Sequence, residues 1–212
     1  MPIIRAFWFA TLVLLVLPSA AQTEERAQAV LAGGCFWSMQ PPFDGRDGIL
    51  ETELGYTGGH TLNPGYWQVV TGNTGHVEAV RIVYDPSRID YAEILDIFWR
   101  SIDPTDAHGQ FCDRGAHYRT AIFAQDAEQR TIAEAARATL DHSERFDLPV
   151  ATRILGAKPF HRAEDVHQDY YRNHPERYAD YVAQCGREER LQALWGPPND
   201  RPRKHSTPSP TR

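Results

Sequence analysis

Hydrophobic residues along the chain follow two periods, and together they predict alternating strands and helices. Short apolar or alternating runs are typical of strands, whereas apolar positions three and four residues apart are typical of amphipathic helices. We expect strands at 27–32, 48–56, 77–84, 118–124 and 150–155. We expect helices to begin at Cys35 and to cover 87–100, 126–142, 163–173 and a further turn from 175 to 181.

The order of these elements predicts an α/β or α+β sandwich of two layers. Two polar stretches interrupt the periodic segments, at 60–75 and 103–117, and both are expected to be loops. Long loops inside a compact domain usually carry function. Candidate chemistry is therefore expected in these two stretches and at the strand-to-helix junction around Cys35.

The two ends of the chain differ from the body. Arg5 precedes an apolar run at 7–17, and Pro18 and small residues follow it, which indicates a secretory signal peptide over residues 1–21. The run is short for a membrane span of about 20 residues, so an uncleaved anchor is the less favoured alternative. Export to the bacterial periplasm is expected. Residues 197–212 are basic and rich in proline and are expected to form a disordered tail, which leaves 22–196 as one catalytic domain.

Composition narrows the classes of protein that remain. The chain has 212 residues, of which 42% are hydrophobic and 24% charged, which is ordinary globular usage and excludes collagen and multi-span membrane proteins. The formal charge is −6, and the body is more acidic than its ends, which argues against a nucleic-acid partner. Three cysteines are too few for a disulfide scaffold, and their odd number leaves at least one thiol unpaired.

Cys35 is a candidate nucleophile. It follows Gly33 and Gly34 and precedes the aromatic pair Phe36 and Trp37. At the start of a helix, backbone N–H groups and the helix dipole stabilise a thiolate. Two neighbouring aromatic rings suit an apolar substrate group. The alternative is a buried structural cysteine among core aromatics, and the residues alone support both interpretations about equally.

Glu78 is a candidate proton donor because it lies in the middle of a predicted strand. If its side chain faces the core, burial raises its pKa and gives an acid that is still protonated near neutral pH. The alternative is a charge that faces solvent on an edge strand.

Other polar residues in or beside the two loops could take part in the same chemistry. Tyr66 and Tyr118 carry phenols that can donate hydrogen bonds to a polarised oxygen, and Asp113 lies nearby in the sequence. Ordinary loop packing is the alternative for each. His108, Cys112 and His117 match no common zinc spacing, so no metal is expected.

Five motifs in order resemble the A-type peptide methionine sulfoxide reductases. They are Gly-Gly-Cys-Phe-Trp at 33–37, Gly-Tyr-Thr-Gly-Gly at 55–59, Gly-His-Val-Glu-Ala-Val at 75–80, Asp-Arg-Gly at 113–115 leading into Tyr-Arg at 118–119, and Ala-Glu-Asp-Val-His-Gln at 163–168. The resemblance runs from about residue 29 to 195 and implies a mixed sheet with a ferredoxin-like core and flanking helices. It also implies reduction of the S epimer of methionine sulfoxide, free or in proteins, as a repair reaction.

The resemblance implies a role for each matching residue in the reaction itself. Cys35 is the implied nucleophile, which becomes a sulfenic acid as methionine is released. Glu78 is the implied proton donor. Tyr66 and Tyr118 are implied to hydrogen-bond the sulfoxide oxygen.

Substrate binding is implied for a second set of residues. Phe36 and Trp37 would form the pocket for the S-methyl group. Asp113 would hold the substrate or the polar network of the site, and His167 would support the pocket.

Recycling of the nucleophile requires a second thiol. Family members commonly place it in the C-terminal region, so Cys185 is favoured over Cys112 as the partner of Cys35, with Cys112 as the spare. A thioredoxin-like protein would then reduce the disulfide by exchange. No cofactor is expected. The expected substrates are oxidised proteins and free methionine sulfoxide. Membrane contact is expected only through the signal peptide, and the protein is expected to be a monomer.

Two other functions fit part of the pattern. A thiol peroxidase or thiol–disulfide oxidoreductase would use Cys35 but would not need Glu78 or the tyrosines. A non-catalytic module for methionine-rich segments would use the aromatic residues but not the thiol.

Overall fold

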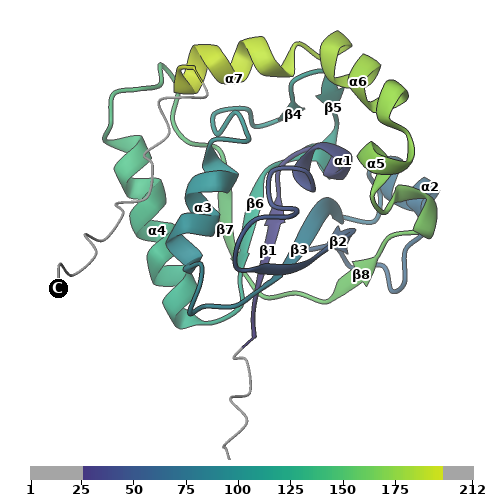
Figure 1. Ribbon diagram of the computed structural model, residues 1–212, viewed down its shortest axis with the longest axis horizontal. Helices are drawn as coiled ribbons and strands as arrows, with labels where there is room; N and C mark the ends of the chain where they lie inside the picture. The colour runs from purple at the N-terminus through teal and green to yellow at the C-terminus, as the bar shows by residue number, and fades with distance from the viewer. Residues whose placement is uncertain (1–25, 198–212) are drawn as a thin grey trace, which may run out of the picture.

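A six-stranded sheet organises the fold in the computed structural model, which describes residues 26–197 (Figure 1). The strand order is β7-β6-β1-β3-β2-β8, and every pair is antiparallel except β6 and β7. The mixed sheet with flanking helices confirms the predicted α/β sandwich. The strands are β1 (Ala27–Ala32), β2 (Ile49–Thr57), β3 (Val77–Tyr84), β6 (Ala121–Ala124), β7 (Arg153–Gly156) and β8 (Phe160–Arg162).

The helices vary from single turns to four turns in length. The longest, α4, supplies the crossover that the parallel pair β6 and β7 requires. Asp126 caps its N-terminus as the sequence predicts, because the carboxylate accepts from the N–H of Gln129. The helices are α1 (Phe36–Met39), α2 (Tyr66–Val70), α3 (Tyr91–Trp99), α4 (Ala127–Asp141), α5 (Tyr170–Asn173), α6 (Pro175–Gln184) and α7 (Arg187–Trp195).

The two segments that we predicted to be loops contain short helices and strands. Residues 60–75 include α2, and residues 103–117 include the hairpin of β4 (Gly109–Gln110) and β5 (Asp113–Arg114). Two 3₁₀ turns complete the fold, η1 (Ala116–Tyr118) and η2 (Asp165–His167). These elements are too short to give a hydrophobic period, which is why the sequence pattern does not show them.

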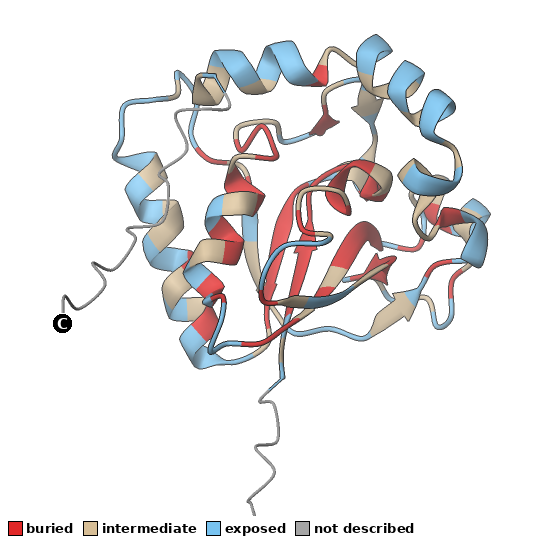
Figure 2. Ribbon diagram, in the orientation of Figure 1, coloured by how far each residue is buried: buried red, intermediate tan, exposed pale blue. Residues whose placement is uncertain are grey.

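The core lies on both faces of the central strands. In β1, Ala29 and Leu31 face the helix-covered side of the sheet, whereas Val30 and Ala32 belong to a smaller cluster on the opposite side. Burial is concentrated in these central strands and in α1, drawn red in Figure 2. Since Val80 and Ile82 of β3 belong to the larger cluster, Glu78 is in phase with them and faces the helix-covered side.

The predicted helix at 163–173 is wrong. The segment forms η2 and, after a break, the single turn α5. The break occurs at Asp169, whose φ of 51° is left-handed. Long-range hydrogen bonds override the local pattern, since the N–H of Ala163 donates to the carbonyl of Leu54 at 2.9 Å. Strand β8 and helix α7 are further elements that the sequence analysis missed.

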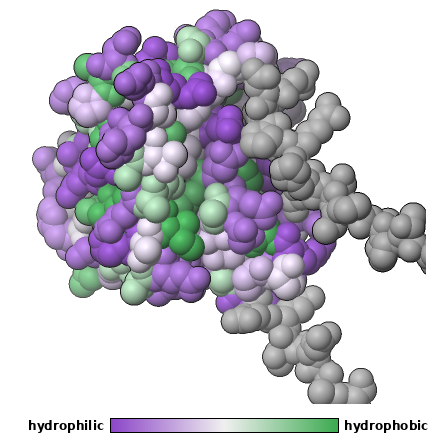
Figure 3. Space-filling model, turned by 90° about the vertical axis from the view of Figure 1, so that its left-hand side faces the viewer, coloured by the Kyte–Doolittle hydropathy of each residue, from purple (hydrophilic) through white to green (hydrophobic). Residues whose placement is uncertain are grey.

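The outer surface is largely hydrophilic on the face that lies at the left of Figure 1, with smaller hydrophobic groups between (Figure 3). Within residues 26–197, helices are too short or too polar to cross a bilayer. The predicted signal peptide lies wholly outside the described residues, and the predicted tail lies almost wholly outside them.

Gly55 is expected to be essential for the pairing of β2 with β8. A Cβ atom at this position would lie 2.4 Å from the carbonyl oxygen of His161 on the neighbouring strand. We expect Gly55→Ala to lower the free energy of unfolding by about 1–3 kcal/mol, as measured by urea denaturation. Gly156→Ala is the matched control, because its Cβ would meet only the mobile end of Arg130 at 3.5 Å. Equal losses in the two variants would contradict this account.

Candidate active site

Cys35 lies between β1 and α1, where the chain turns from the sheet into the helix. Gly34 adopts a φ of +90°, and a Cβ there would lie 2.5 Å from the side chain of Gln110. Glycine therefore lets the β4–β5 hairpin approach the nucleophile. The Cys35 side chain is buried, and among the cysteines it is the free thiol.

Burial controls the ionisation of Cys35. It raises the pKa of the thiol above its ordinary value, and the charges of Glu78 and Asp113 raise it further, whereas hydrogen bonds from Tyr181 and from the backbone of Trp37 oppose the rise. We expected the helix N-terminus to stabilise a thiolate, but desolvation outweighs this stabilisation in the structure. Helix α1 has only 4 residues, so its dipole is too small to offset desolvation.

Glu78 is an uncharged acid beside the nucleophile. Its side chain is 1% exposed, and its carboxylate oxygen Oε2 accepts a hydrogen bond from the N–H of Phe36 at 3.0 Å. Burial raises the pKa of Glu78 to about 8; the Phe36 hydrogen bond opposes this rise and the charge of Asp113 adds to it. Of the two orientations that the sequence left open, the inward-facing one is therefore observed, and the raised pKa favours the protonated acid at neutral pH.

Tyr66 and Tyr118 reach the same site from α2 and from the end of η1. Burial raises the pKa of both phenols, and the charges of Glu78 and Cys35 raise both further. The charges of the nucleophile and of the acid therefore act on both phenols. Both remain protonated, so both can donate hydrogen bonds.

Aromatic rings enclose the site on the side of α1. Trp37 stacks on Tyr170 with ring centroids 3.8 Å apart, and its Nε1 donates to Nδ1 of His167 at 3.3 Å. The His167 ring also contacts Phe36 at 5.2 Å and Tyr66 at 4.6 Å. Burial lowers the pKa of His167, so the imidazole is neutral and can accept this hydrogen bond. The structure thus brings together the aromatic residues that the sequence analysis assigned to the pocket.

Asp113 and Tyr181 form the remaining polar pair. The Tyr181 hydroxyl donates to Oδ2 of Asp113 at 2.5 Å and lies within hydrogen-bonding reach of Cys35 as the alternative acceptor. Burial raises the pKa of Asp113, and the Tyr181 hydrogen bond and the charge of Arg187 oppose this rise. Sequence reasoning missed Tyr181. The available signal was its position four residues before Cys185, which places both side chains on the same face of a helix.

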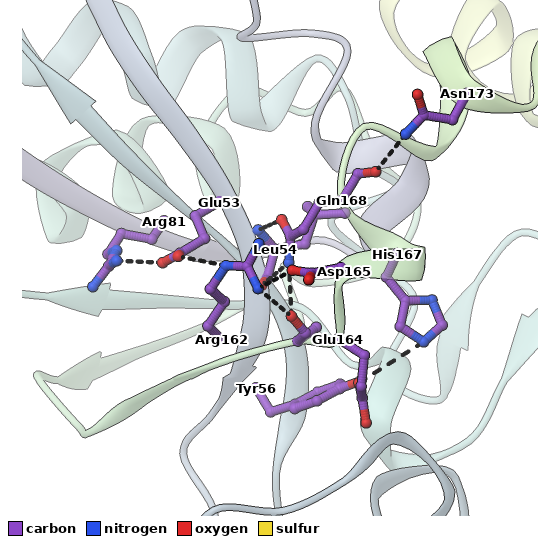
Figure 4. A network of polar contacts seen from close by, with 11 residues as sticks. Glu53, Leu54, Tyr56, Arg81, Arg162, Glu164, Asp165, His167, Gln168 and Asn173 are labelled. Atoms are coloured by element: carbon purple, nitrogen blue, oxygen red, sulfur yellow. Dashed lines mark hydrogen bonds and ion pairs between the residues drawn. The ribbon is translucent and has the colours of Figure 1, made fainter.

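A polar network holds the segment after β8 against β2 (Figure 4). The amide of Gln168 accepts from the N–H of Leu54 and donates to its carbonyl, both at 2.9 Å. The carboxylate of Glu164 accepts from the Tyr56 hydroxyl at 2.9 Å and from the N–H of Tyr66 at 2.8 Å. These contacts fix both the His167 segment and the start of α2 in relation to the sheet.

The other two cysteines are paired with each other. Cys112, between β4 and β5, forms a disulfide with Cys185 at the C-terminus of α6. The expectation that Cys112 is a spare thiol is therefore wrong. Cys112 is exposed and Cys185 partly buried. Their neighbours Asp113 and Tyr181 hydrogen-bond each other, so the disulfide adjoins the site without including Cys35.

Arg187, the first residue of α7, links this helix to elements near the nucleophile and the disulfide. Its buried guanidinium donates to the carbonyl of Ser101 at 2.5 Å and lies 4.5 Å from the ring centroid of Phe111. It also approaches the sulfur of Met39 in α1 at 3.8 Å. Arg187 thus connects α7 to the helix that carries the nucleophile and to the hairpin that carries Cys112. Nothing in the sequence pattern singled it out.

Two other features of the described residues concern ligands: one cluster of potential metal-binding groups and one groove. Within the described residues, one set of side chains has its ligand atoms within 4.8 Å of one another: Cys112, Asp113 and Cys185. Two of these ligands are sulfurs already bonded to each other, so they cannot act as thiolates. A groove of about 1040 Å³ between α3, α6 and α7 contains none of the predicted site residues.

The raised pKa of Glu78 makes stability depend on pH. Between pH 4.5 and about 8 the native state binds more protons than the unfolded state, so the free energy of unfolding falls as pH rises through this window. Glu78→Gln cannot ionise, and its amide oxygen can still accept from Phe36. We expect the stability of the variant relative to the parent to rise from about pH 5 to about pH 9, measured by urea denaturation. A constant difference would show that Glu78 is already ionised.

Comparisons with known proteins agree with this arrangement. The family model described as "Peptide methionine sulfoxide reductase" matches residues 27–198. The chain is similar to the protein named peptide methionine sulfoxide reductase MsrA of Bacillus licheniformis, with 52% identity over 177 residues, which is 84% of this chain and 98% of that protein. A namesake from Leuconostoc mesenteroides is 55% identical over 74% of this chain and 91% of its own length.

Solved structures give the same result. Methionine sulfoxide reductase A of Corynebacterium diphtheriae matches with a TM-score of 0.64 and 30% identity, over 73% of this chain and 77% of that chain. Mxr1 from Saccharomyces cerevisiae in its reduced form matches with a TM-score of 0.66 and 26% identity, over 73% of this chain and 88% of that chain.

Proposed function

The chain belongs to the peptide methionine sulfoxide reductase family, and on that premise we propose how its own residues reduce the S epimer of methionine sulfoxide. The enzyme is a thiol-dependent oxidoreductase, and its products are methionine and an oxidised cysteine. The observation that carries the assignment of roles is the buried carboxyl group of Glu78, held by the N–H of Phe36 next to the buried free thiol of Cys35. A thiol peroxidase would have no use for this acid.

Binding places the sulfoxide sulfur beside Cys35. The S-methyl group packs against Phe36 and Trp37, whose apolar rings favour a methyl group over water. His167 fixes the indole of Trp37 through its hydrogen bond at 3.3 Å. The sulfoxide oxygen then faces Glu78.

The oxygen atom requires hydrogen-bond donors because negative charge develops on it as the S–O bond breaks. Glu78, Tyr66 and Tyr118 are all protonated at neutral pH because burial raises the pKa of each group. Fixed donors in a site that excludes water stabilise such a charge strongly. The two tyrosines therefore act as hydrogen-bond donors and Glu78 as the acid.

The first half of the reaction conserves protons within the site. Cys35 loses its thiol proton and attacks the sulfoxide sulfur, while Glu78 gives its proton to the oxygen. The S–O bond and the new bond between the two sulfurs then break as the hydroxyl group passes to Cys35, which leaves as products methionine and a Cys35 sulfenic acid. The thiol proton then restores Glu78. Of the two protons present at the start, one ends on the sulfenic acid and one on Glu78, so the buried site gains no net charge.

The second half regenerates the thiol of Cys35. A reduced Cys185 condenses with the sulfenic acid, so that water leaves and a Cys35–Cys185 disulfide forms. Cys112 then attacks Cys185, which gives the Cys112–Cys185 pair and releases Cys35 as a thiol. A thioredoxin-like dithiol protein reduces this pair by exchange. The exposure of Cys112 supports this step, because it leaves one sulfur of the disulfide accessible.

Cys35→Ser tests the assignment of the nucleophile. With dithiothreitol as the reductant and methionine S-sulfoxide as the substrate, we expect no methionine above background by chromatography, because a serine hydroxyl cannot take up the oxygen. Cys112→Ser is the matched control and should still release methionine. Turnover by Cys35→Ser would show that another residue is the nucleophile.

Cys185→Ser tests the recycling step. We expect the variant to release about one methionine per enzyme, because Cys35 remains, and then to stop when a thioredoxin-like protein is the sole reductant. Mass spectrometry with a sulfenic-acid trap should find the label on Cys35. If Cys185→Ser cycles normally and Cys112→Ser does not, Cys112 is the residue that resolves the sulfenic acid.

A further inference from the structure

Large apolar side chains are exposed beside the substrate pocket. Leu62 is 82% exposed, Trp67 78% and Val166 63%. Each is close in sequence to a residue of the site: Leu62 lies in the loop that leads into α2, Trp67 follows Tyr66, and Val166 precedes His167. We call Leu62, Trp67 and Val166 the apolar rim.

Contacts between α2 and η2 place the rim at one side of the pocket. The rings of Tyr66 and His167 lie 4.6 Å apart, and the N–H of Tyr66 donates to Glu164 at the start of η2. The Trp67 ring contacts the Tyr66 ring at 5.2 Å in an edge-on arrangement. The outward side chains of the two elements therefore flank the residues that enclose the substrate.

The exposure of these residues needs a physical reason. Tryptophan is strongly buried on average, and where it is exposed at a binding surface it contributes much of the binding energy. The charged groups beside the rim already have partners, since Asp165 pairs with Arg162 and Glu164 accepts two hydrogen bonds. The rim therefore presents apolar surface beside charged groups that already have partners.

The ligand of the pocket indicates what covers the rim. The pocket holds a methionine sulfoxide side chain, so the polypeptide on either side of that residue must continue across the mouth of the site. Methionine is chiefly a core residue with apolar neighbours, and its oxidation disrupts that packing. An oxidised protein thus exposes apolar residues next to the sulfoxide, whereas the free amino acid has none.

We propose that the apolar rim binds large apolar side chains that flank methionine sulfoxide in a polypeptide substrate, and that it makes such segments better substrates than free methionine sulfoxide. This inference rests on the proposed function, since it names the substrate class of the same site. The rim binds the flanking residues and takes no part in the transfer of oxygen.

The test compares kcat/KM for three substrates: free methionine S-sulfoxide, a pentapeptide with leucine on both sides of the sulfoxide, and the same peptide with serine in place of leucine. The parent should prefer the leucine peptide to both others. Leu62→Ser and Trp67→Ala should each lower the ratio of leucine peptide to serine peptide by about 10-fold, which is the effect of an interface side chain that contributes more than ~1 kcal/mol.

The ratio separates binding at the rim from damage to the site. Trp67 contacts Tyr66, so a displaced Tyr66 would lower the rates for all substrates together and leave the ratio unchanged. Leu148→Ser is the control, because Leu148 is 63% exposed but lies after α4, and it should retain the parental ratio. An unchanged ratio in both rim variants, or a parent without a preference for the leucine peptide, would overturn the proposed role of the rim but not the proposed function. Failure of the parent to reduce any of the substrates would overturn the proposed function and the rim with it.

Discussion

The hydrogen bond between the N–H of Phe36 and the buried carboxyl group of Glu78 is the contact on which the site depends. It joins β3 to the first turn of α1, 42 residues apart in the chain. Burying an ionised carboxylate would cost several kcal/mol, so the carboxyl group stays protonated instead. The same burial keeps the neighbouring thiol protonated. One structural constraint therefore supplies both the geometry of the site and its two protons.

The aromatic pocket depends on contacts made late in the chain. Strand β8 pairs with β2, and Gln168 then occupies both backbone groups of Leu54. These bonds position His167 next to Trp37, and the hydrogen bond to Glu164 positions the start of α2 at the same pocket. Since each buried backbone group needs a partner, the segment after β8 satisfies the edge of the sheet and builds the pocket with the same hydrogen bonds.

Sequence reasoning succeeded where a residue's role depends on the phase of its own element. The apolar period placed β1, β3, α3 and α4 correctly. For Glu78 the pattern left both directions open, and the family resemblance implied the buried one. Sequence reasoning failed where distant segments decide. The helix at 163–173 was broken by hydrogen bonds to Leu54, and the Cys112–Cys185 pair joins segments 73 residues apart. The raised pKa of Cys35 was missed for the same reason, because the position of a residue at the start of a helix does not reveal its burial or the nearby charges of Glu78 and Asp113.

The distribution of the three cysteines separates the two halves of the reaction in space. Cys35 is 6% exposed and lies under Tyr181, so a thiol in this position is shielded from oxidants that do not fit the pocket. Cys112 is exposed, so the sulfur that a bulky reductant must reach lies outside the pocket. The disulfide lies on the β4–β5 hairpin and at the end of α6, whereas the apolar rim lies on α2 and η2 (Figure 1). In the proposed reaction, transfer of the disulfide away from Cys35 thus restores the nucleophile and presents the oxidising equivalents away from the proposed binding surface for the substrate.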